Sequence, residues 1–105
     1  MFAHFKFDDG SNPYISFTNK AFYWMLKHYY VKQIGETSFR VIGRKNPVKG
    51  YYGNKQFLRD RAIEWQISSS DYNYSYMDFA AWSDFFREYG KRYGLLTEFR
   101  ENGIC

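Results

Sequence analysis

The sequence predicts an α+β fold, in which an antiparallel sheet of about four strands packs against two main helices. Two observations support this class. Short segments alternate between apolar and polar residues and are separated by turn formers, whereas two longer segments carry apolar residues at helical spacing. The expected order is β-β-α-β-β-α. At 105 residues the chain has the length of one domain, so we expect residues 1–105 to form a single compact α+β domain.

The first half of the chain predicts a hairpin, a helix and a third strand. Residues 2–7 approximate alternation, and residues 14–17 return as a second strand after a segment of turn-forming residues. Apolar residues then recur at helical spacing, which predicts a helix over residues 19–33 that ends at Gly35. Residues 37–43 alternate again and predict the third strand.

The fourth strand is predicted over residues 61–68. Apolar side chains occupy every second position there, at Ile63, Trp65 and Ile67, which is typical of a half-buried strand. The preceding residues 55–60 fit either a helical turn or an extension of this strand, and periodicity does not separate the two.

The second main helix is predicted to begin after Ser75 and to end at Gly94. Ser75 and Asp78 have the spacing of a capping box, in which a side chain binds the free backbone N–H groups of the first turn. Residues 95–102 then predict a short final helix. The expected apolar stripe of the main helix consists of Phe79, Trp82, Phe86, Tyr89 and Tyr93.

Aromatic residues make up 24% of the chain, including 11 tyrosines and 11 phenylalanines. Most of the phenylalanines are expected in a small core built from rings. A buried tyrosine needs a partner for its hydroxyl group, so several tyrosines are expected at the surface. Because tyrosine and tryptophan are favoured at binding interfaces, this composition favours a protein that presents a binding surface.

Basic residues are concentrated in one part of the sequence. Residues 20–61 contain ten basic and two acidic residues, whereas the rest of the chain contains five basic and nine acidic ones. This asymmetry favours one face that binds a polyanion or an acidic protein surface.

The first candidate site is the stretch RKNPVKGYYGNK, residues 44–55. Proteins that bind single strands use cations to contact phosphates and aromatic rings to stack on bases, and this stretch supplies both. The alternative is a solvated turn between two strands. The candidate residues in and around the stretch are Arg40, Arg44, Lys45, Lys49, Tyr51, Tyr52, Lys55, Arg59 and Arg61.

The second candidate site lies in residues 68–78. Tyr72, Tyr74 and Tyr76 alternate there with small polar residues, which is the chemistry of antibody contact loops. The alternative is that these tyrosines pack over the edge of the core.

Known catalytic and metal-binding patterns are absent from the sequence. His4, His28 and Cys105 are its only histidines and cysteine, and no two of them have zinc-ligand spacing. A nucleophile elbow and a glycine-rich phosphate loop are absent as well. Glu64 could serve a metal-dependent nuclease, but Asp60 is too close in sequence to lie on a neighbouring strand. We therefore expect no metal, no cofactor and no enzymatic activity.

Export and membrane signals are also absent. The N-terminal residues lack the basic and apolar segments of a signal peptide, and no run of about 18 apolar residues occurs. A single cysteine excludes an intrachain disulfide. These features predict a cytoplasmic protein with no membrane contact.

In size, in its expected single α+β domain and in its richness in Tyr, Phe, Lys and Asn, the chain resembles the anti-CRISPR proteins, small accessory proteins of phages and mobile elements. The resemblance rests on size and composition and not on a motif, so it transfers no site residue. It implies an inhibitor of a CRISPR effector nuclease in the cytoplasm of the host cell. Many anti-CRISPR proteins are acidic mimics of DNA. A basic chain implies docking on a protein surface or on bound nucleic acid instead.

Together these observations predict a non-catalytic binding protein that inhibits or modulates a nucleic-acid-processing complex through a protein partner. The alternative is a weakly specific domain that binds single-stranded DNA or RNA directly through residues 40–61. A third hypothesis is a structural protein of a virion, which would form a homo-oligomer through its tyrosines. Salt separates these classes, because direct binding to a polyanion weakens steeply as salt rises.

Overall fold

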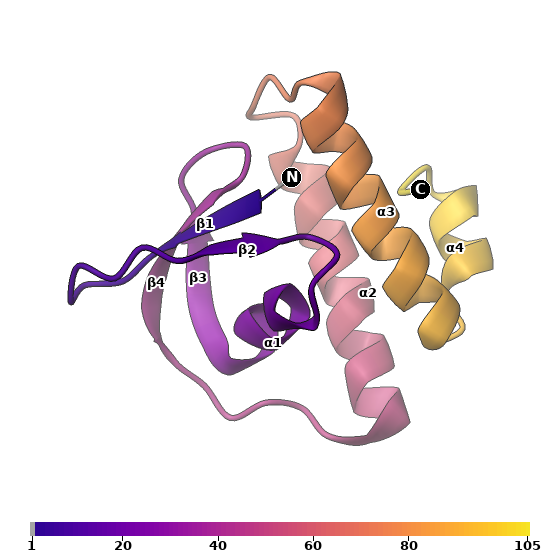
Figure 1. The fold of residues 1–105 in the computed structure, drawn as a ribbon. Coiled ribbons are helices and arrows are strands. Elements are labelled where there is room, and N and C mark those ends of the chain that lie inside the picture. The colour runs from indigo at the N-terminus through magenta and orange to yellow at the C-terminus, as the bar shows by residue number, and fades with distance from the viewer. Residues whose placement is uncertain (1) are drawn as a thin grey trace. The chain divides into compact units, whose positions relative to one another are not determined.

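The computed structural model describes residues 2–105, and these form a four-stranded sheet and four helices (Figure 1). The prediction of an α+β fold is therefore confirmed, although the order of the elements differs from the predicted one. In chain order the elements are β1 (Phe2–Lys6), β2 (Tyr14–Ser16), α1 (Lys20–His28), β3 (Tyr29–Gln33), β4 (Ser38–Arg44), α2 (Gly50–Ser68), α3 (Tyr76–Arg92) and α4 (Leu96–Glu101).

The chain divides into two compact units, residues 1–47 and residues 48–105. The first unit contains the sheet and α1, and the second contains α2, α3 and α4. A single domain over residues 1–105 stays a prediction.

The sheet is mixed, with the strand order β2-β1-β4-β3. Its two outer pairs, β1 with β2 and β3 with β4, are antiparallel, whereas the central strands β1 and β4 are parallel. The prediction of an antiparallel sheet is therefore wrong at its centre. Parallel neighbours require a long crossover, and the segment that contains β2, α1 and β3 supplies it between β1 and β4.

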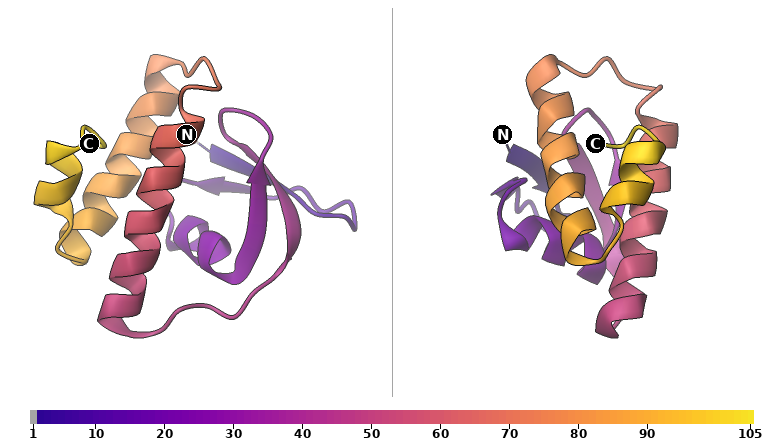
Figure 2. Two further views of the ribbon diagram at one scale, coloured as in Figure 1. Left: turned by 180° about the vertical axis from the view of Figure 1, so that it is seen from behind. Right: turned by 90° about the vertical axis from the view of Figure 1, so that its right-hand side faces the viewer.

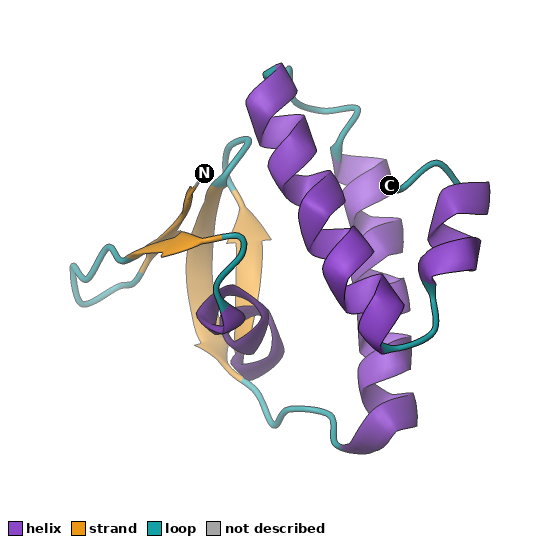
Figure 3. Cartoon of the chain, turned by 45° about the vertical axis from the view of Figure 1, so that its right-hand side comes forward, coloured by secondary structure: helices purple, strands orange, loops and turns teal. Residues whose placement is uncertain are grey.

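One face of the sheet carries the core of the first unit. The buried rings of Phe5 on β1 and Phe39 on β4 stack at 5.3 Å between centroids. Phe22 of α1 packs on both, at 6.0 Å from Phe5 and 6.3 Å from Phe39, so α1 covers this face (Figure 3). Within residues 2–47 no helix crosses the opposite face.

The helix predicted over residues 19–33 is wrong in its second half. The α1 helix begins after Asn19, whose side chain accepts a hydrogen bond from Ala21 N at 2.9 Å, and it ends at His28. The residues that follow, YYVKQ, form β3, with burial that alternates along the strand. Aromatic and β-branched residues favour a half-buried strand, and pairing with β4 satisfies their backbone.

The strand predicted over residues 61–68 is also wrong, because these residues form the C-terminal part of the 19-residue helix α2. The buried positions Leu58, Ala62 and Trp65 follow helical spacing. Ile63 and Ile67, which gave the apparent alternation, are 49% and 68% exposed. They lie one helical turn apart on the exposed side.

The predicted second main helix is confirmed as α3, and Ser75 is its N-cap, with Asp78 N donating to Ser75 Oγ at 3.1 Å. Figures 1 and 2 show α3 beside α2, and α4 beside α3. Trp82 stacks on Trp65 of α2 at 4.8 Å, and its neighbour in the core, Phe86, packs on Phe99 of α4.

The predicted apolar stripe differs from the structure at two positions. Phe85, which the predicted stripe does not include, is buried, and Phe79, which it includes, is 49% exposed. The short final helix is confirmed as α4. Across residues 2–105, no helix has the length and apolar character needed to cross a membrane.

Candidate functional site

The face of the sheet opposite α1, which no helix of residues 2–47 covers, carries three cationic side chains in one line. We call it the uncovered face. Lys6 on β1 pairs with Arg40 on β4, and Arg40 pairs with Lys32 on β3. Directly paired residues point to the same side of a sheet, so these side chains stand next to one another. All three are exposed. We call Lys6, Arg40 and Lys32 the cation row.

No carboxylate neutralises the cation row. Among residues 2–105 none of its three side chains forms an ion pair, and none has a side-chain hydrogen bond within the protein. Like charges directly opposite each other destabilise a sheet. The three side chains therefore repel one another, at positions where Thr or Gln would avoid this repulsion.

Aromatic rings border the cation row on both sides. On β3, Tyr30 is two residues before Lys32, points to the same face and is 58% exposed. The Nζ atom of Lys45 lies 5.3 Å from the centroid of the Tyr30 ring. On the far side, His4 of β1 stacks on Tyr14 of β2 with ring centroids 4.3 Å apart.

Two of the three carboxylates of this unit lie in a turn outside the cation row. Asp8 and Asp9 are in the turn between β1 and β2, where they line a cavity of about 240 Å³ together with Arg44. The backbone N–H of Ser11 donates to Asp9 Oδ1 at 2.8 Å and holds the pKa of Asp9 below its usual value. Asp9 is thus a turn former, as the sequence predicts.

Counted by unit, the charges divide unequally. Residues 48–105 contain eight basic and eight acidic residues, so their formal charges cancel. Residues 1–47 contain seven basic and three acidic residues. Their formal net charge of +4 is therefore that of the whole chain. The sheet unit is therefore the basic part of the protein.

The stretch at residues 44–55 is not a hairpin loop between two strands, because the predicted fourth strand is a helix. Arg44 ends β4, and its guanidinium carbon lies 5.6 Å from the centroid of the Tyr29 ring. Lys49 is the N-cap residue of α2 and makes no capping hydrogen bond with its side chain. The boundary between the two units falls inside this stretch.

The two tyrosines of the stretch lie in the first turn of α2. Tyr51 packs on Tyr93 with ring centroids 5.8 Å apart, and Lys55 Nζ is 6.0 Å from the Tyr51 ring. Tyr52 is 81% exposed and meets the Tyr51 ring edge-on. Tyr51 is thus partly structural, and Tyr52 is the more accessible ring.

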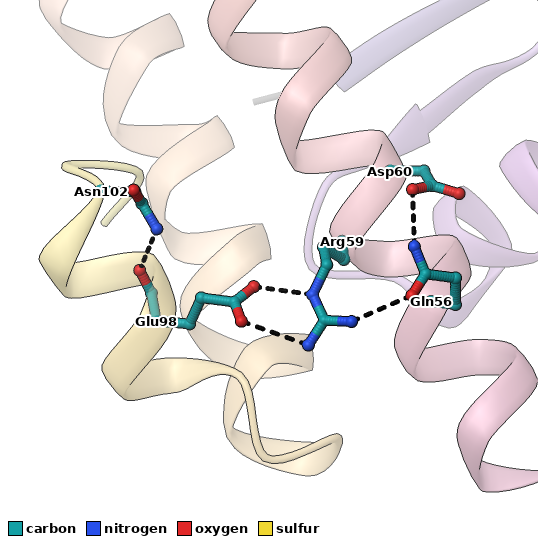
Figure 4. Close-up of polar contacts among 5 residues, drawn as sticks. All are labelled: Gln56, Arg59, Asp60, Glu98 and Asn102. Carbon is teal, nitrogen blue, oxygen red and sulfur yellow. Dashed lines mark hydrogen bonds and ion pairs between the residues drawn. The ribbon is translucent and has the colours of Figure 1, made fainter.

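The last two cationic candidates are both engaged with carboxylates. Arg59 of α2 donates to Glu98 of α4 from Nε at 2.8 Å and from Nη2 at 3.2 Å (Figure 4). These bonds hold the pKa of Glu98 below its usual value and raise that of Arg59. Arg61 pairs with Glu64 at 2.8 Å, while burial lowers the Arg61 pKa.

The tyrosines of residues 68–78 divide into two groups. Tyr74 packs edge-on against Trp65 at 4.8 Å, and Tyr72 lies 6.1 Å from Tyr74, so both cover the edge of the core. Tyr76, at the start of α3, is 88% exposed and is followed by the exposed Met77 and Phe79. We call Tyr76, Met77 and Phe79 the α3 patch.

A groove of about 400 Å³ adjoins the α3 patch. Its lining residues are Tyr76, Phe79, Ala80, Ser83, Asp84 and Arg87. Arg87 donates to Asp84 at 2.7 Å along this side of the helix. The groove combines apolar rings with one balanced ion pair.

Sequence reasoning missed Lys6, Lys32 and Tyr30 as candidates. Lys6 could have been found, because alternation in residues 2–7 places it on the face of the strand opposite Phe5 and Phe7. Lys32 and Tyr30 could not have been found, because the sequence predicts a helix there. Residues of that helix would not share a sheet face with Arg40.

Comparison of the chain with protein-family models, with curated proteins and with solved structures gives no match in any of the three. Among residues 2–105, no three His, Cys, Asp or Glu side chains gather into a group that could hold a metal ion.

Proposed function

We propose that the chain is a non-catalytic binding protein that inhibits or modulates a nucleic-acid-processing complex of a host cell. More specifically, the composition favours a phage-encoded protein that inhibits a CRISPR effector nuclease. The chain would act by docking on a protein of the complex and blocking a step, without chemistry of its own.

The observation that carries this proposal is the α3 patch. Tyr76, Met77 and Phe79 are 88%, 64% and 49% exposed within one helical turn, next to a groove. Tyr, Met and Phe are enriched at protein interfaces. Tyr76 and Phe79 are three residues apart on one side of α3 and both line the groove, whereas Met77 is exposed on the neighbouring side of the helix. The unit around the patch has no formal net charge, which suits contact with a protein better than contact with a polyanion.

The test is inhibition of a reconstituted nuclease. Guide-loaded CRISPR effector nucleases of several types would each be incubated with the chain, and cleavage of a labelled target DNA would be followed. We expect one effector to lose activity at a stoichiometric amount of the chain. The double variant Tyr76→Ser, Met77→Ser should need at least tenfold more protein for the same inhibition, because central aromatic contacts dominate binding energy.

The matched control is Tyr52→Ser. Tyr52 is 81% exposed and lies in the first turn of α2, outside the α3 patch, so its loss removes a similar ring elsewhere. Tyr52→Ser should inhibit as the wild type does. An equal loss of inhibition in Tyr52→Ser and in the double variant would mean that the chain docks through a surface other than the α3 patch. An absence of binding and inhibition with every effector would contradict the CRISPR form of the proposal.

A further inference from the structure

We infer that the uncovered face of the sheet binds single-stranded nucleic acid, with the cation row on the phosphates and Tyr30 stacked on a base. This goes beyond docking through the α3 patch, because it assigns a second surface, in the other unit, and a second class of partner.

The geometry of the cation row suits a chain of phosphates. Neighbouring strands are about 4.8 Å apart, so Lys6, Arg40 and Lys32 span roughly 10 Å across β1, β4 and β3. Each is exposed and free of internal ion pairs, so none must give up a carboxylate to bind. Arg40, in the middle, can donate two parallel hydrogen bonds to a phosphate, and the flanking lysines add point charges.

Charge complementarity favours a polyanion over a neutral partner. The whole net charge of +4 belongs to the sheet unit, and its face combines a row of cations with accessible rings. A bound polyanion would also relieve the repulsion between the paired cations, because its negative charges offset theirs.

The rings favour a single strand over a duplex. Tyr30 is 58% exposed, and its outer face can stack only on a base that is not already stacked in a helix. Lys45 lies 5.3 Å from the centroid of this ring and adds a further charge beside the stacking position. Recognition of this kind tolerates many sequences, because every base has an aromatic face.

The test is fluorescence anisotropy with a labelled 12-nucleotide oligo(dT) and the matching oligo(U), each titrated with the whole chain at several salt concentrations. We expect binding to both or to one of them, with an affinity that falls as salt rises. The triple variant Lys6→Ala, Lys32→Ala, Arg40→Ala should bind more weakly and lower the salt slope by about 2, at roughly 0.7 per phosphate contact for single strands.

The ring and the charge are tested separately. Tyr30→Ala loses one stacked base and should bind the oligonucleotide roughly 5- to 150-fold more weakly. Tyr30→Phe keeps the stacking and should bind as the wild type does. The charge control is Lys20→Ala, which removes one cation from the same unit on α1, outside the sheet. It should leave the salt slope unchanged. Circular dichroism of each variant confirms folding.

Three outcomes would overturn the inference. They are absence of binding at low salt, equal binding by wild type and triple variant, and full competition by a poly-glutamate peptide of the same charge. The last outcome would assign the face to an acidic protein surface. Nuclease inhibition by the triple variant reports separately on the α3 patch, so either proposal can fail alone.

Discussion

Gly90 of α3 and Phe99 of α4 are in direct contact, and only a glycine fits at this position. A Cβ atom added to Gly90 would lie 2.8 Å from Cδ2 and 3.1 Å from Cε2 of the Phe99 ring. Phe99 is 1% exposed and packs edge-on against Phe86, so its ring has little room to move. The close approach of these two helices therefore depends on a missing side chain.

Gly90→Ala should destabilise the protein. Overpacking in a core costs about 1–3 kcal/mol, and the better helix propensity of alanine returns about 1 kcal/mol of it. We expect the free energy of unfolding in urea to fall by up to about 2 kcal/mol. Gly53→Ala is the control, because its Cβ would meet Val48 at an ordinary 3.4 Å in α2. That variant should be neutral or more stable, and equal losses at both positions would contradict the packing argument.

The ion pair of Arg59 with Glu98 should make stability depend on pH in the acidic range. Arg59 lowers the pKa of Glu98 from its ordinary value of 4.5 in the folded protein. A lowered pKa gives stabilisation that is fully present above the unfolded pKa and is lost as the pH falls through the folded one. The advantage of wild type over Glu98→Gln should therefore shrink as the pH falls below 4.5.

The size of this effect is limited by solvent. Side chains of the pair are 34% and 39% exposed, so we expect about 0.2–1 kcal/mol at pH ~7. The measurement is urea unfolding at several pH values and low salt. Glu101→Gln on the same helix, which removes an exposed carboxylate without an ion pair in residues 2–105, should leave stability unchanged. A constant difference between wild type and Glu98→Gln at all pH values would refute the assignment.

Ser75→Ala should weaken α3 at its beginning. The Ser75 hydroxyl accepts the backbone N–H of Asp78, and loss of such a cap costs about 1 kcal/mol. Ser75→Asp keeps an acceptor and adds a negative charge at the helix N-terminus, so it should retain wild-type stability. Thermal unfolding of the two variants distinguishes loss of the cap from loss of the serine itself.

Arg40→Thr should stabilise the folded protein while it weakens binding to an anion. Removing the central charge relieves two unfavourable cross-strand pairs, worth roughly 0.2–1 kcal/mol each, and threonine favours strands. The gain should be largest at low salt and shrink as screening increases. Lys20→Ala on α1 should show no such dependence. A variant less stable than wild type at low salt would mean that the cation row is not under repulsion.

Parts of the fold with a simple local signal could be predicted from the sequence. The hairpin of β1 and β2 follows from alternation on both sides of a segment of turn formers. The α3 helix follows from the Ser75 cap and from Trp82, Phe86 and Tyr89 at helical spacing. In both cases local propensity and tertiary packing agree.

The remaining elements depend on long-range contacts. In α2, the exposed Ile63 and Ile67 alternate with buried Trp65, so period-two spacing arises by coincidence in a helix. In β3, Tyr29 fits the helical pattern of α1, but pairing with Arg44 places it in the sheet. The cation row depends on both β3 and the parallel pairing of β1 with β4, so neither composition nor periodicity could locate it.

The most direct test of the account is a nuclear magnetic resonance titration of the 15N-labelled chain with a 12-nucleotide oligo(dT). We infer that the uncovered sheet face, and not residues 49–55 at the start of α2, binds the nucleic acid. We predict chemical-shift changes at Lys6, Tyr30, Lys32 and Arg40 that saturate together. Changes confined to residues 49–55, or no changes at low salt, would contradict it.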